Sequence, residues 1–317
     1  MTLLKVEDLR VEFATVNGSV KALDGVSFTV NKGEVVGVVG ESGSGKTTLG
    51  LAILKILPPN GRIVSGKIVF GGRDLVKLSE EDMTKVRGKE ISMIFQDPMT
   101  SLNPTMRIID HIAEALIVHY GLSKEDARSR AIEALTAVGI PENRALDYPH
   151  QLSGGMRQRV MIAISYALKP KLLIADEPTT ALDVIVQDQI LDLLKELRNR
   201  QKTSILFITH DLSVVADIAD KVIIMYAGKV LEIGSIEQIY YNTLHPYTQG
   251  LLKSIPKIGN NSDLYTIPGN PPDMLNPPPG CRFHPRCPFA EEKCRKEEPP
   301  LIEVSKDHYV ACWRCVK

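Results

Sequence analysis

Residues 40–48 read GESGSGKTT and decide the fold, because they set three glycines among small polar residues before a lysine and two threonines. The preceding run EVVGVV, residues 34–39, is typical of a buried parallel strand. Residues 49–57, LGLAILKIL, favour a helix that ends before Pro58 and Pro59. A glycine-rich loop between strand and helix turns backbone N–H groups toward one anion, so the stretch predicts a phosphate-binding loop.

The side chains of this loop fit a nucleoside triphosphate. Lys46 is expected to reach the β- and γ-phosphates, and the Thr47 hydroxyl to bind Mg²⁺. Thr48 is expected to donate to a phosphate from the next position. The candidate nucleotide-binding residues of the loop are Gly40, Glu41, Ser42, Gly43, Ser44, Gly45, Lys46, Thr47 and Thr48.

Composition narrows the class of protein. The 317 residues are 44% apolar, enough for a large domain and a smaller one, and 38 Lys and Arg balance 38 Asp and Glu. A nucleic-acid partner is therefore not expected, since it favours a clustered basic excess. The chain has no signal-peptide pattern at its start and no apolar run near the about 18 residues of a membrane span. We expect a soluble, cytoplasmic protein that acts at a membrane through membrane subunits.

The order of patterns predicts an α/β fold. Alternating residues over 3–13 and 20–30 indicate antiparallel strands with a turn at residues 17 and 18, and residues 65–75 suggest a further hairpin-like strand. Helical patterns dominate residues 97–169, for example over 108–122 and 124–140. Strands return at 171–176, 203–210 and 221–228, with a helix over 184–201. Strand and helix alternate around a parallel sheet, into which the helical block is inserted.

Two carboxylates end the strand LLIADE, residues 172–177. Side chains at the carboxyl end of a parallel strand point toward the ligand crevice of an α/β sheet. We expect Asp176 to hold Mg²⁺ and Glu177 to act as general base toward the attacking water.

A second anion site is predicted in LSGGM, residues 152–156. Ser153 is a natural helix N-cap, and Gly154 and Gly155 let backbone N–H groups approach a ligand closely. The alternative is an ordinary capped helix.

Over roughly residues 1–250 the chain resembles the nucleotide-binding subunits of ATP-binding cassette (ABC) transporters. The resemblance rests on the phosphate loop, on FQDP at 95–98, on LSGGM, on LLIADE, on ALD at 181–183 and on His210, all in family order. It implies a P-loop NTPase fold with an antiparallel β subdomain, a helical subdomain over 97–169 and a cassette over 1–250.

The resemblance also assigns roles to residues. Gln96 is implied to contact Mg²⁺ and the attacking water, His210 to contact the γ-phosphate, and Phe13 to stack on adenine. Phe13 also fits an ordinary core position of a strand. Ser153, Gly154, Gly155 and Asp183 are implied to close over ATP held by a second subunit, in a head-to-tail dimer with an identical or paralogous ATPase. Met156 stands where the family commonly has glutamine.

The C-terminal extension, residues 251–317, resembles that of dipeptide and oligopeptide importer ATPases. The resemblance rests on residues 243–256 and 278–290 and on QDPMTSLNP at 96–104. It implies an ATPase that drives peptide uptake from the inner face of the membrane, through two permease subunits served by an extracellular peptide-binding protein. Nickel and other small-solute importers of the same subfamily remain an alternative. A soluble ABC ATPase without a transport role and an electron-transfer protein are two further alternatives.

All five cysteines lie in this extension, at Cys281, Cys287, Cys294, Cys312 and Cys315. Four thiolates suit zinc or a [4Fe–4S] cluster, and wide spacings in a proline-rich segment favour the cluster, with zinc and unligated thiols as the alternatives. The subfamily resemblance also implies an iron–sulfur cluster here, bound by Cys281, Cys287, Cys294 and Cys312, with Cys315 spare. His284 and His308 are interpreted as ordinary polar positions. We expect the extension to lie apart from the core that holds Gly40 and His210.

Overall fold

The computed structural model describes residues 1–180, 182–256 and 265–316. Its chain divides into two units, one made of residues 1–77 and 207–317 and the other of residues 78–206. Each unit is described separately, and strand β8, Ser204–Thr209, has residues in both.

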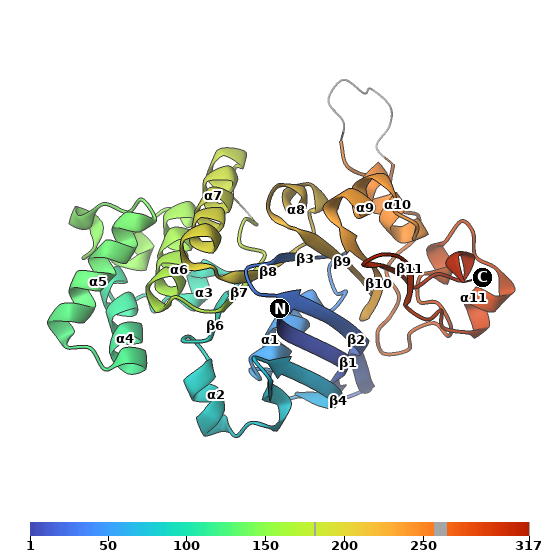
Figure 1. Cartoon of the computed structure of the whole chain (residues 1–317), viewed down its shortest axis with the longest axis horizontal. Helices are drawn as coiled ribbons and strands as arrows, with labels where there is room; N and C mark the ends of the chain where they lie inside the picture. The colour runs from blue at the N-terminus through green and yellow to red at the C-terminus, as the bar shows by residue number, and fades with distance from the viewer. Residues whose placement is uncertain (181, 257–264, 317) are drawn as a thin grey trace. The chain divides into compact units, whose positions relative to one another are not determined.

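The first unit begins with a four-stranded antiparallel sheet in the order β2-β1-β4-β5 (Figure 1). Its strands are β1 Thr2–Thr15, β2 Gly18–Asn31, β4 Gly61–Phe70 and β5 Arg73–Asp74. Strands β1 and β2 form the predicted hairpin, in which Phe13 pairs with Val20 and Thr15 with Gly18. The turn therefore falls on residues 16 and 17, one residue earlier than expected.

A second group of strands in this unit runs in the order β11-β12-β10-β9-β3. Their bounds are β3 Val35–Val39, β9 Lys221–Tyr226, β10 Lys229–Ser235, β11 Ile302–Ser305 and β12 His308–Val310. Strand β3 is buried at all five positions and pairs in parallel with β9, as its apolar run predicts. The C-terminal hairpin β11–β12 joins through β12, where Glu232 pairs with Val310. The extension is thus part of a sheet of the first unit.

Short helices complete the first unit. They are α1 Lys46–Ile53, α8 Leu212–Ile218, α9 Ile236–Tyr241, α10 Pro246–Lys253 and α11 Glu292–Lys296, with 3-10 turns at Leu75–Lys77, His284–Arg286 and Trp313–Cys315. Helix α8 lies close to β3: a Cβ on Gly37 of β3 would stand only 2.4 Å from Cγ1 of Val215 in α8. An aromatic cluster joins Phe283 of the extension to Tyr226 of β9 and Tyr247 of α10, with ring centroids 5.3 Å apart in both pairs.

The second unit is mainly helical, as the sequence pattern predicts (Figure 1). Its helices are α2 Glu80–Val86, α3 Pro98–Ser101, α4 Ile108–Tyr120, α5 Lys124–Ala137, α6 Gly154–Leu168 and α7 Val184–Gln201, with 3-10 turns at Glu142–Arg144 and Pro149–Gln151. Strands β6 Ile91–Ile94 and β7 Leu172–Asp176 pair in parallel. A buried hydrogen bond of 2.8 Å between the hydroxyls of Ser92 and Ser165 ties β6 to α6.

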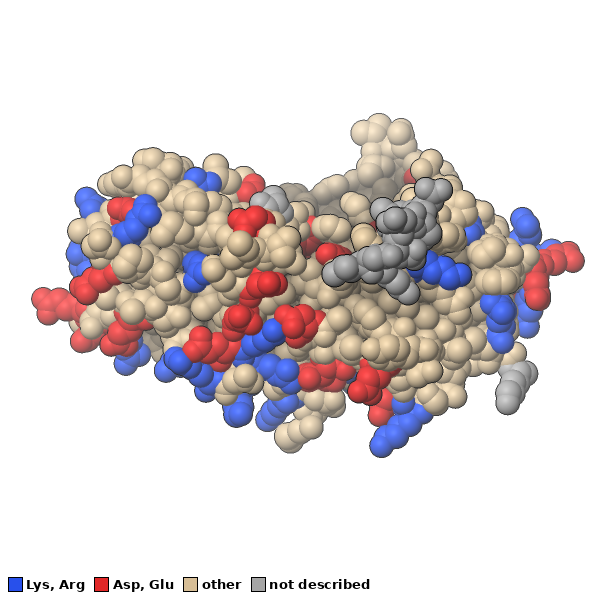
Figure 2. Space-filling model, turned by 90° about the horizontal axis from the view of Figure 1, so that it is seen from above, with Lys and Arg blue, Asp and Glu red and all other residues tan. Residues whose placement is uncertain are grey.

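Charged side chains of both signs lie on the face of the molecule that Figure 2 draws. On the face drawn in Figure 2, acidic and basic side chains of the described residues are intermixed. Within residues 1–180, 182–256 and 265–316, no helix is both long enough and apolar enough to cross a membrane.

Candidate functional site

The phosphate loop is shaped by glycines at two close approaches. A Cβ on Gly40 would stand 2.1 Å from the carbonyl oxygen of Met225 in β9, which leaves room for no other residue. Gly45 has φ 99° and would place a Cβ 2.5 Å from the carbonyl oxygen of Ala22. Because both neighbours are backbone atoms that cannot move aside, the course of the loop between β3 and α1 is set by the sheets.

The side chain of Lys46 lies against this loop and is almost fully buried. Its Nζ donates to the carbonyl oxygens of Gly40 at 2.7 Å and Glu41 at 2.9 Å. The backbone N–H of Gly228 donates to the carbonyl of Ser44 at 2.9 Å, which fastens the loop from the β9–β10 side. The ammonium group is therefore held at the loop, where the sequence predicts that it meets phosphate.

The remaining loop residues differ in exposure. Ser42, Gly43 and Thr47 are exposed, and Thr48 is half-buried at the start of α1. The roles of Thr47 and Thr48 toward Mg²⁺ and phosphate stay predictions.

The carboxylates of the second unit stand at the end of β7. Asp176 is buried, and Glu177 follows it with φ 46°, a left-handed backbone conformation that non-glycine residues rarely adopt. Gln96 and Glu177 are in direct contact: Nε2 of Gln96 donates a hydrogen bond of 3.1 Å to Oε2 of Glu177. Strain of this kind concentrates at functional sites, where the surrounding contacts maintain it.

Thr180 also contacts Glu177, and the sequence did not single it out. Its hydroxyl donates to Oε2 of Glu177 at 2.9 Å, and its backbone N–H donates to the carbonyl of Glu177 at 3.2 Å. The signal that would have indicated it is a hydroxyl residue three positions after a carboxylate in a turn. Thr180 and Gln96 together fix the direction of the Glu177 carboxylate.

The LSGGM segment opens α6 as predicted. Ser153 is its N-cap and accepts a hydrogen bond of 3.4 Å from the N–H of Met156. A Cβ on Gly155 would stand 2.6 Å from Cγ1 of Val186, so this glycine also permits close packing of α6 on α7. The sulfur of Met156 accepts from Arg144 at 3.4 Å.

Three predicted nucleotide residues remain, Asp183, His210 and Phe13. Asp183 is the N-cap of α7 and accepts from the N–H of Val186 at 2.9 Å, and Ala181 beside it lies outside the described residues. His210 is exposed directly after β8. Phe13 is half-buried, and its ring lies against Gly61, where a Cβ would stand 2.6 Å from Cε1. The Phe13 side chain is therefore neither fully buried in the core nor fully exposed to solvent.

Four of the five cysteines surround one small pocket. Its lining contains Cys281, Cys287, Cys294 and Cys312 together with His245, Pro246, Phe283, His284, Phe289, Trp313 and Arg314, whereas Cys315 lies outside that lining. Burial raises the pKa of the Cys281 thiol to about 12 and that of Cys312 to about 11. Across the described residues, no three His, Cys, Asp or Glu side chains are placed to share a single metal ion.

The two histidines of the extension have hydrogen-bond partners in the protein. Nδ1 of His284 lies 3.0 Å from the carbonyl of Cys281, and Nε2 of His308 lies 2.9 Å from Oε1 of the buried Glu232. His308 thus has an ordinary structural role, as interpreted from the sequence, while His284 also lines the cysteine pocket.

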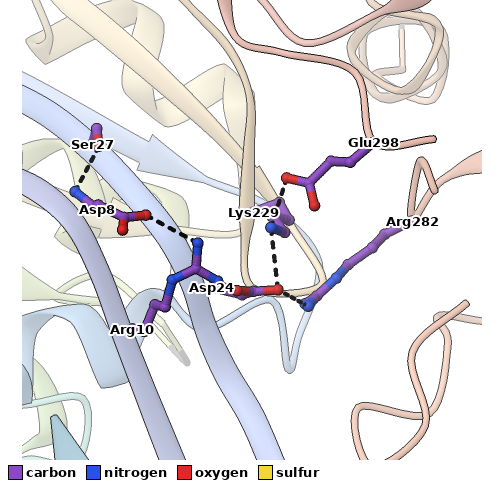
Figure 3. Close-up of polar contacts among 7 residues, drawn as sticks. All are labelled: Asp8, Arg10, Asp24, Ser27, Lys229, Arg282 and Glu298. Carbon is purple, nitrogen blue, oxygen red and sulfur yellow. Dashed lines mark hydrogen bonds and ion pairs between the residues drawn. The ribbon is translucent and has the colours of Figure 1, made fainter. Parts of the chain in front are cut away.

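The extension is not separate from the strands that carry the phosphate loop, and that expectation is wrong. Figure 3 shows Asp24 of β2 between Arg10 and two cations, Lys229 of β10 and Arg282 of the extension. Lys229 also pairs with Glu298 at 2.6 Å. The sequence could not indicate the pairing of Asp24 with Lys229 and Arg282, because these residues lie more than 200 positions from Asp24.

The ion pairs of Asp24 with Lys229, Arg282 and Arg10 depend on the ionised form of its carboxyl group. Burial alone would raise the pKa of its carboxyl, but Lys229, Arg282 and Arg10 hold that pKa below its ordinary value. A lowered folded-state pKa contributes stability above the ordinary Asp pKa of about 4, and this contribution is lost only as the pH falls below it.

Two family models match the chain. The model described as ABC transporter matches residues 23–180, and the model described as Oligopeptide/dipeptide transporter, C-terminal region, matches residues 231–294. The chain is 54% identical to the oligopeptide transport ATP-binding protein OppD of Bacillus subtilis, over 98% of this chain and 88% of that protein. It is 53% identical to the dipeptide transport ATP-binding protein DppD of Lactococcus lactis, over 98% and 90%.

Solved structures agree in fold. The dimeric post-hydrolysis structure of the ATP-binding cassette MJ0796 bound to ADP and Pi matches with a TM-score of 0.67 and 29% identity, over 74% of this chain and 98% of that one. CbiO1 from Clostridium perfringens, part of the ABC transporter complex cbiONQ, matches with a TM-score of 0.66 and 30% identity, over 76% and 91%.

The contacts of Glu177 generate a prediction about hydrolysis. Glu177→Gln is expected to lower kcat for ATP by roughly 10²- to 10⁴-fold with nucleotide affinity retained, because the predicted general base is lost. Thr180→Val is expected to lower kcat by about 3- to 30-fold, since it removes a hydrogen bond that orients the Glu177 carboxylate. Steady-state hydrolysis and nucleotide binding by the purified chain measure both effects.

Thr180→Ser is the matched control, because it keeps the hydroxyl and is expected to restore most of the rate. Thr136→Val on the exposed face of α5 controls for the substitution itself. Full activity in Thr180→Val, or an equal loss in Thr180→Ser, would show that the hydroxyl does not position the base.

Proposed function

The chain belongs to the ABC transporter family and is an ATPase, and we propose that it powers uptake of dipeptides and oligopeptides through membrane permease subunits. The observation that carries the proposal is identity of about one half to peptide-transport ATP-binding proteins along 98% of the chain, extension included. A match limited to the cassette would support an ATPase of any substrate class.

ATP is proposed to bind at the phosphate loop of the first unit. Backbone N–H groups of residues 40–48 surround the phosphates, and Lys46, already held at the loop, contacts the β- and γ-phosphates. Phe13 stacks on adenine, and His210 contacts the γ-phosphate. The burial of Lys46 and the close backbone packing at Gly40 support a preorganised anion site, which costs little reorganisation when phosphate arrives.

Magnesium, held by Thr47, Asp176 and Gln96, would neutralise phosphate charge when bound. Glu177 is proposed to take a proton from the attacking water as the water oxygen bonds to the γ-phosphorus and the bond to the leaving ADP oxygen breaks. The hydrogen bonds from Gln96 and Thr180 to Oε2 support this role, because they hold the Glu177 carboxylate in one direction.

The catalytic unit is proposed to be a head-to-tail dimer. Ser153, Gly154, Gly155 and Asp183 of one subunit would close over ATP bound to the phosphate loop of a second ABC ATPase, identical or paralogous. The similar cassette MJ0796 was solved as a dimer bound to ADP and Pi, which supports this arrangement. Two transmembrane permeases and an extracellular peptide-binding protein would complete the importer, and the chain would act at the inner face of the membrane.

Purification of the tagged chain from native membranes in mild detergent tests this proposal. We expect two permease subunits and a second ABC ATPase subunit to co-purify, and ATP hydrolysis by the reconstituted complex to rise when peptide-loaded binding protein is added. Stimulation by nickel or another small solute in place of peptide would overturn the substrate class. Recovery of the chain without any membrane subunit would overturn the transport role.

We also propose that the extension holds a [4Fe–4S] cluster. The donor set fits, because four cysteines line one pocket whose other walls are largely aromatic. A single zinc ion needs its thiolates within about 2.3 Å of one centre, and no such group occurs in the described residues. A four-iron cluster is wider, so its cysteine ligands stand further apart. Cys281, Cys287, Cys294 and Cys312 are the proposed ligands, and bound iron would stabilise the thiolates that burial disfavours.

Protein purified without oxygen is expected to be brown and to carry about four iron atoms per chain. Replacing Cys281, Cys287, Cys294 or Cys312 singly with serine is expected to remove most of the iron, as measured by metal analysis and visible absorption. Cys315→Ser is the matched control and is expected to keep it. Stoichiometric zinc without iron would overturn the cluster, and loss of iron in Cys315→Ser alone would overturn the ligand set.

A further inference from the structure

Arg286 of the extension reaches the phosphate loop. It ends the 3-10 turn His284–Arg286, directly before Cys287. Its Nη1 donates to Oε2 of Glu41 at 2.7 Å, and its Nη2 donates to Oε1 of Glu41 at 3.1 Å. The side chains are 6% and 25% exposed, respectively, so this two-pronged ion pair is largely shielded from water.

Arg286 is itself fixed in place from the extension side. Its Nε donates to the carbonyl of Pro268 at 2.9 Å, and its guanidinium lies 5.7 Å from the ring centroid of Tyr226. The hydroxyl of Tyr226 lies 3.3 Å from Nη1. These contacts leave the Arg286 side chain little rotamer freedom. The position of the extension segment that carries Arg286 therefore determines where the guanidinium meets Glu41.

Glu41 in turn is joined to Lys46. Its carbonyl oxygen accepts from Nζ of Lys46 at 2.9 Å, and its N–H donates to the hydroxyl of Tyr247 at 3.0 Å. Tyr247 is fully buried and packs against Phe283 of the extension. The extension therefore holds Glu41 by its side chain through Arg286 and by its backbone through Tyr247 and Phe283.

We propose that Arg286 is a positioning residue of the nucleotide site, through which the C-terminal extension sets the affinity of the phosphate loop for MgATP. The inference rests on the proposed binding of ATP at residues 40–48. Arg286 fixes the side chain of Glu41, the residue whose carbonyl orients Lys46. It also neutralises a carboxylate that would otherwise repel the phosphates. Folding of the cysteine-bearing segment is thereby coupled to nucleotide binding.

The coupling predicts a specific order among variants of the full chain. Arg286→Met is expected to raise the dissociation constant for MgATP by roughly 3- to 30-fold, because it leaves the Glu41 carboxylate unpaired beside the loop. Glu41→Gln together with Arg286→Met is expected to bind more tightly than Arg286→Met alone, since the unpaired charge is gone. In hydrolysis, KM is expected to rise while kcat changes little.

Calorimetric titration of MgATP into the purified protein measures these affinities, and thermal unfolding is followed in parallel. Arg295→Met is the matched control, because Arg295 is an exposed arginine of the same extension. It is expected to bind MgATP as the wild-type protein does. Arg286→Lys keeps the charge without the two-pronged geometry and is expected to fall between wild type and Arg286→Met.

Wild-type affinity in Arg286→Met, or a double variant weaker than Arg286→Met, would overturn this inference and leave the nucleotide site intact. No MgATP binding by the wild-type protein would overturn the nucleotide site and this inference with it. If Arg286→Met does not fold, wild-type MgATP affinity in a folded Arg286→Lys would overturn the positioning role, and a weakened affinity with an unchanged unfolding temperature would support it.

Discussion

The hydrogen bonds from Lys46 to the carbonyls of Gly40 and Glu41 are the interaction on which the rest of the structure depends. They hold a cation over the phosphate loop, and they exist only because the loop backbone turns back toward α1. That turn requires the backbone of Gly40 to lie against β9, where the Met225 carbonyl excludes any side chain. The pairing of β3 with β9 thus determines where the loop sits, and the loop determines where the ammonium group is held.

A second constraint acts at the end of β7. Asp176, the last residue of the strand, is buried, and the next residue, Glu177, adopts a left-handed backbone conformation. Such a bend costs about 1 kcal/mol or more for a non-glycine residue, so it persists only where neighbours maintain it. Gln96 from the segment after β6 and Thr180 from the turn provide those contacts. The end of β7 and the turn that follows it together set the direction of the Glu177 carboxylate.

The sequence predicted what depends on local pattern. The apolar run before Gly40 predicted β3, the helical period over residues 184–201 matched α7 at both ends, and Ser153 was correctly expected to cap α6. The hairpin β11–β12 was missed, because strands of four and three residues carry too little alternation to be recognised. Its pairing with β10 is a long-range contact that no local pattern encodes.

The same limit explains the site residues that the sequence did not indicate. Arg286 pairs with a residue 245 positions earlier, and an arginine in the segment HPRCP has no local feature that marks it as a partner of the phosphate loop. The sequence also suggested that the extension lies apart from the core that holds Gly40 and His210. The structure instead packs Phe283 against Tyr226 and Tyr247, so the extension uses the core of the first unit.

The central claim is that the phosphate loop of this chain binds ATP and that Ser153 serves a nucleotide held by another subunit. Nucleotide affinity of the isolated, monomeric chain tests it most directly, with Lys46→Ala and Ser153→Arg compared side by side. We expect a large loss of MgATP affinity in Lys46→Ala, because a charge-assisted contact is removed. We expect near-normal affinity in Ser153→Arg, which would block only closure of the dimer. Equal losses of affinity in the two variants would contradict it.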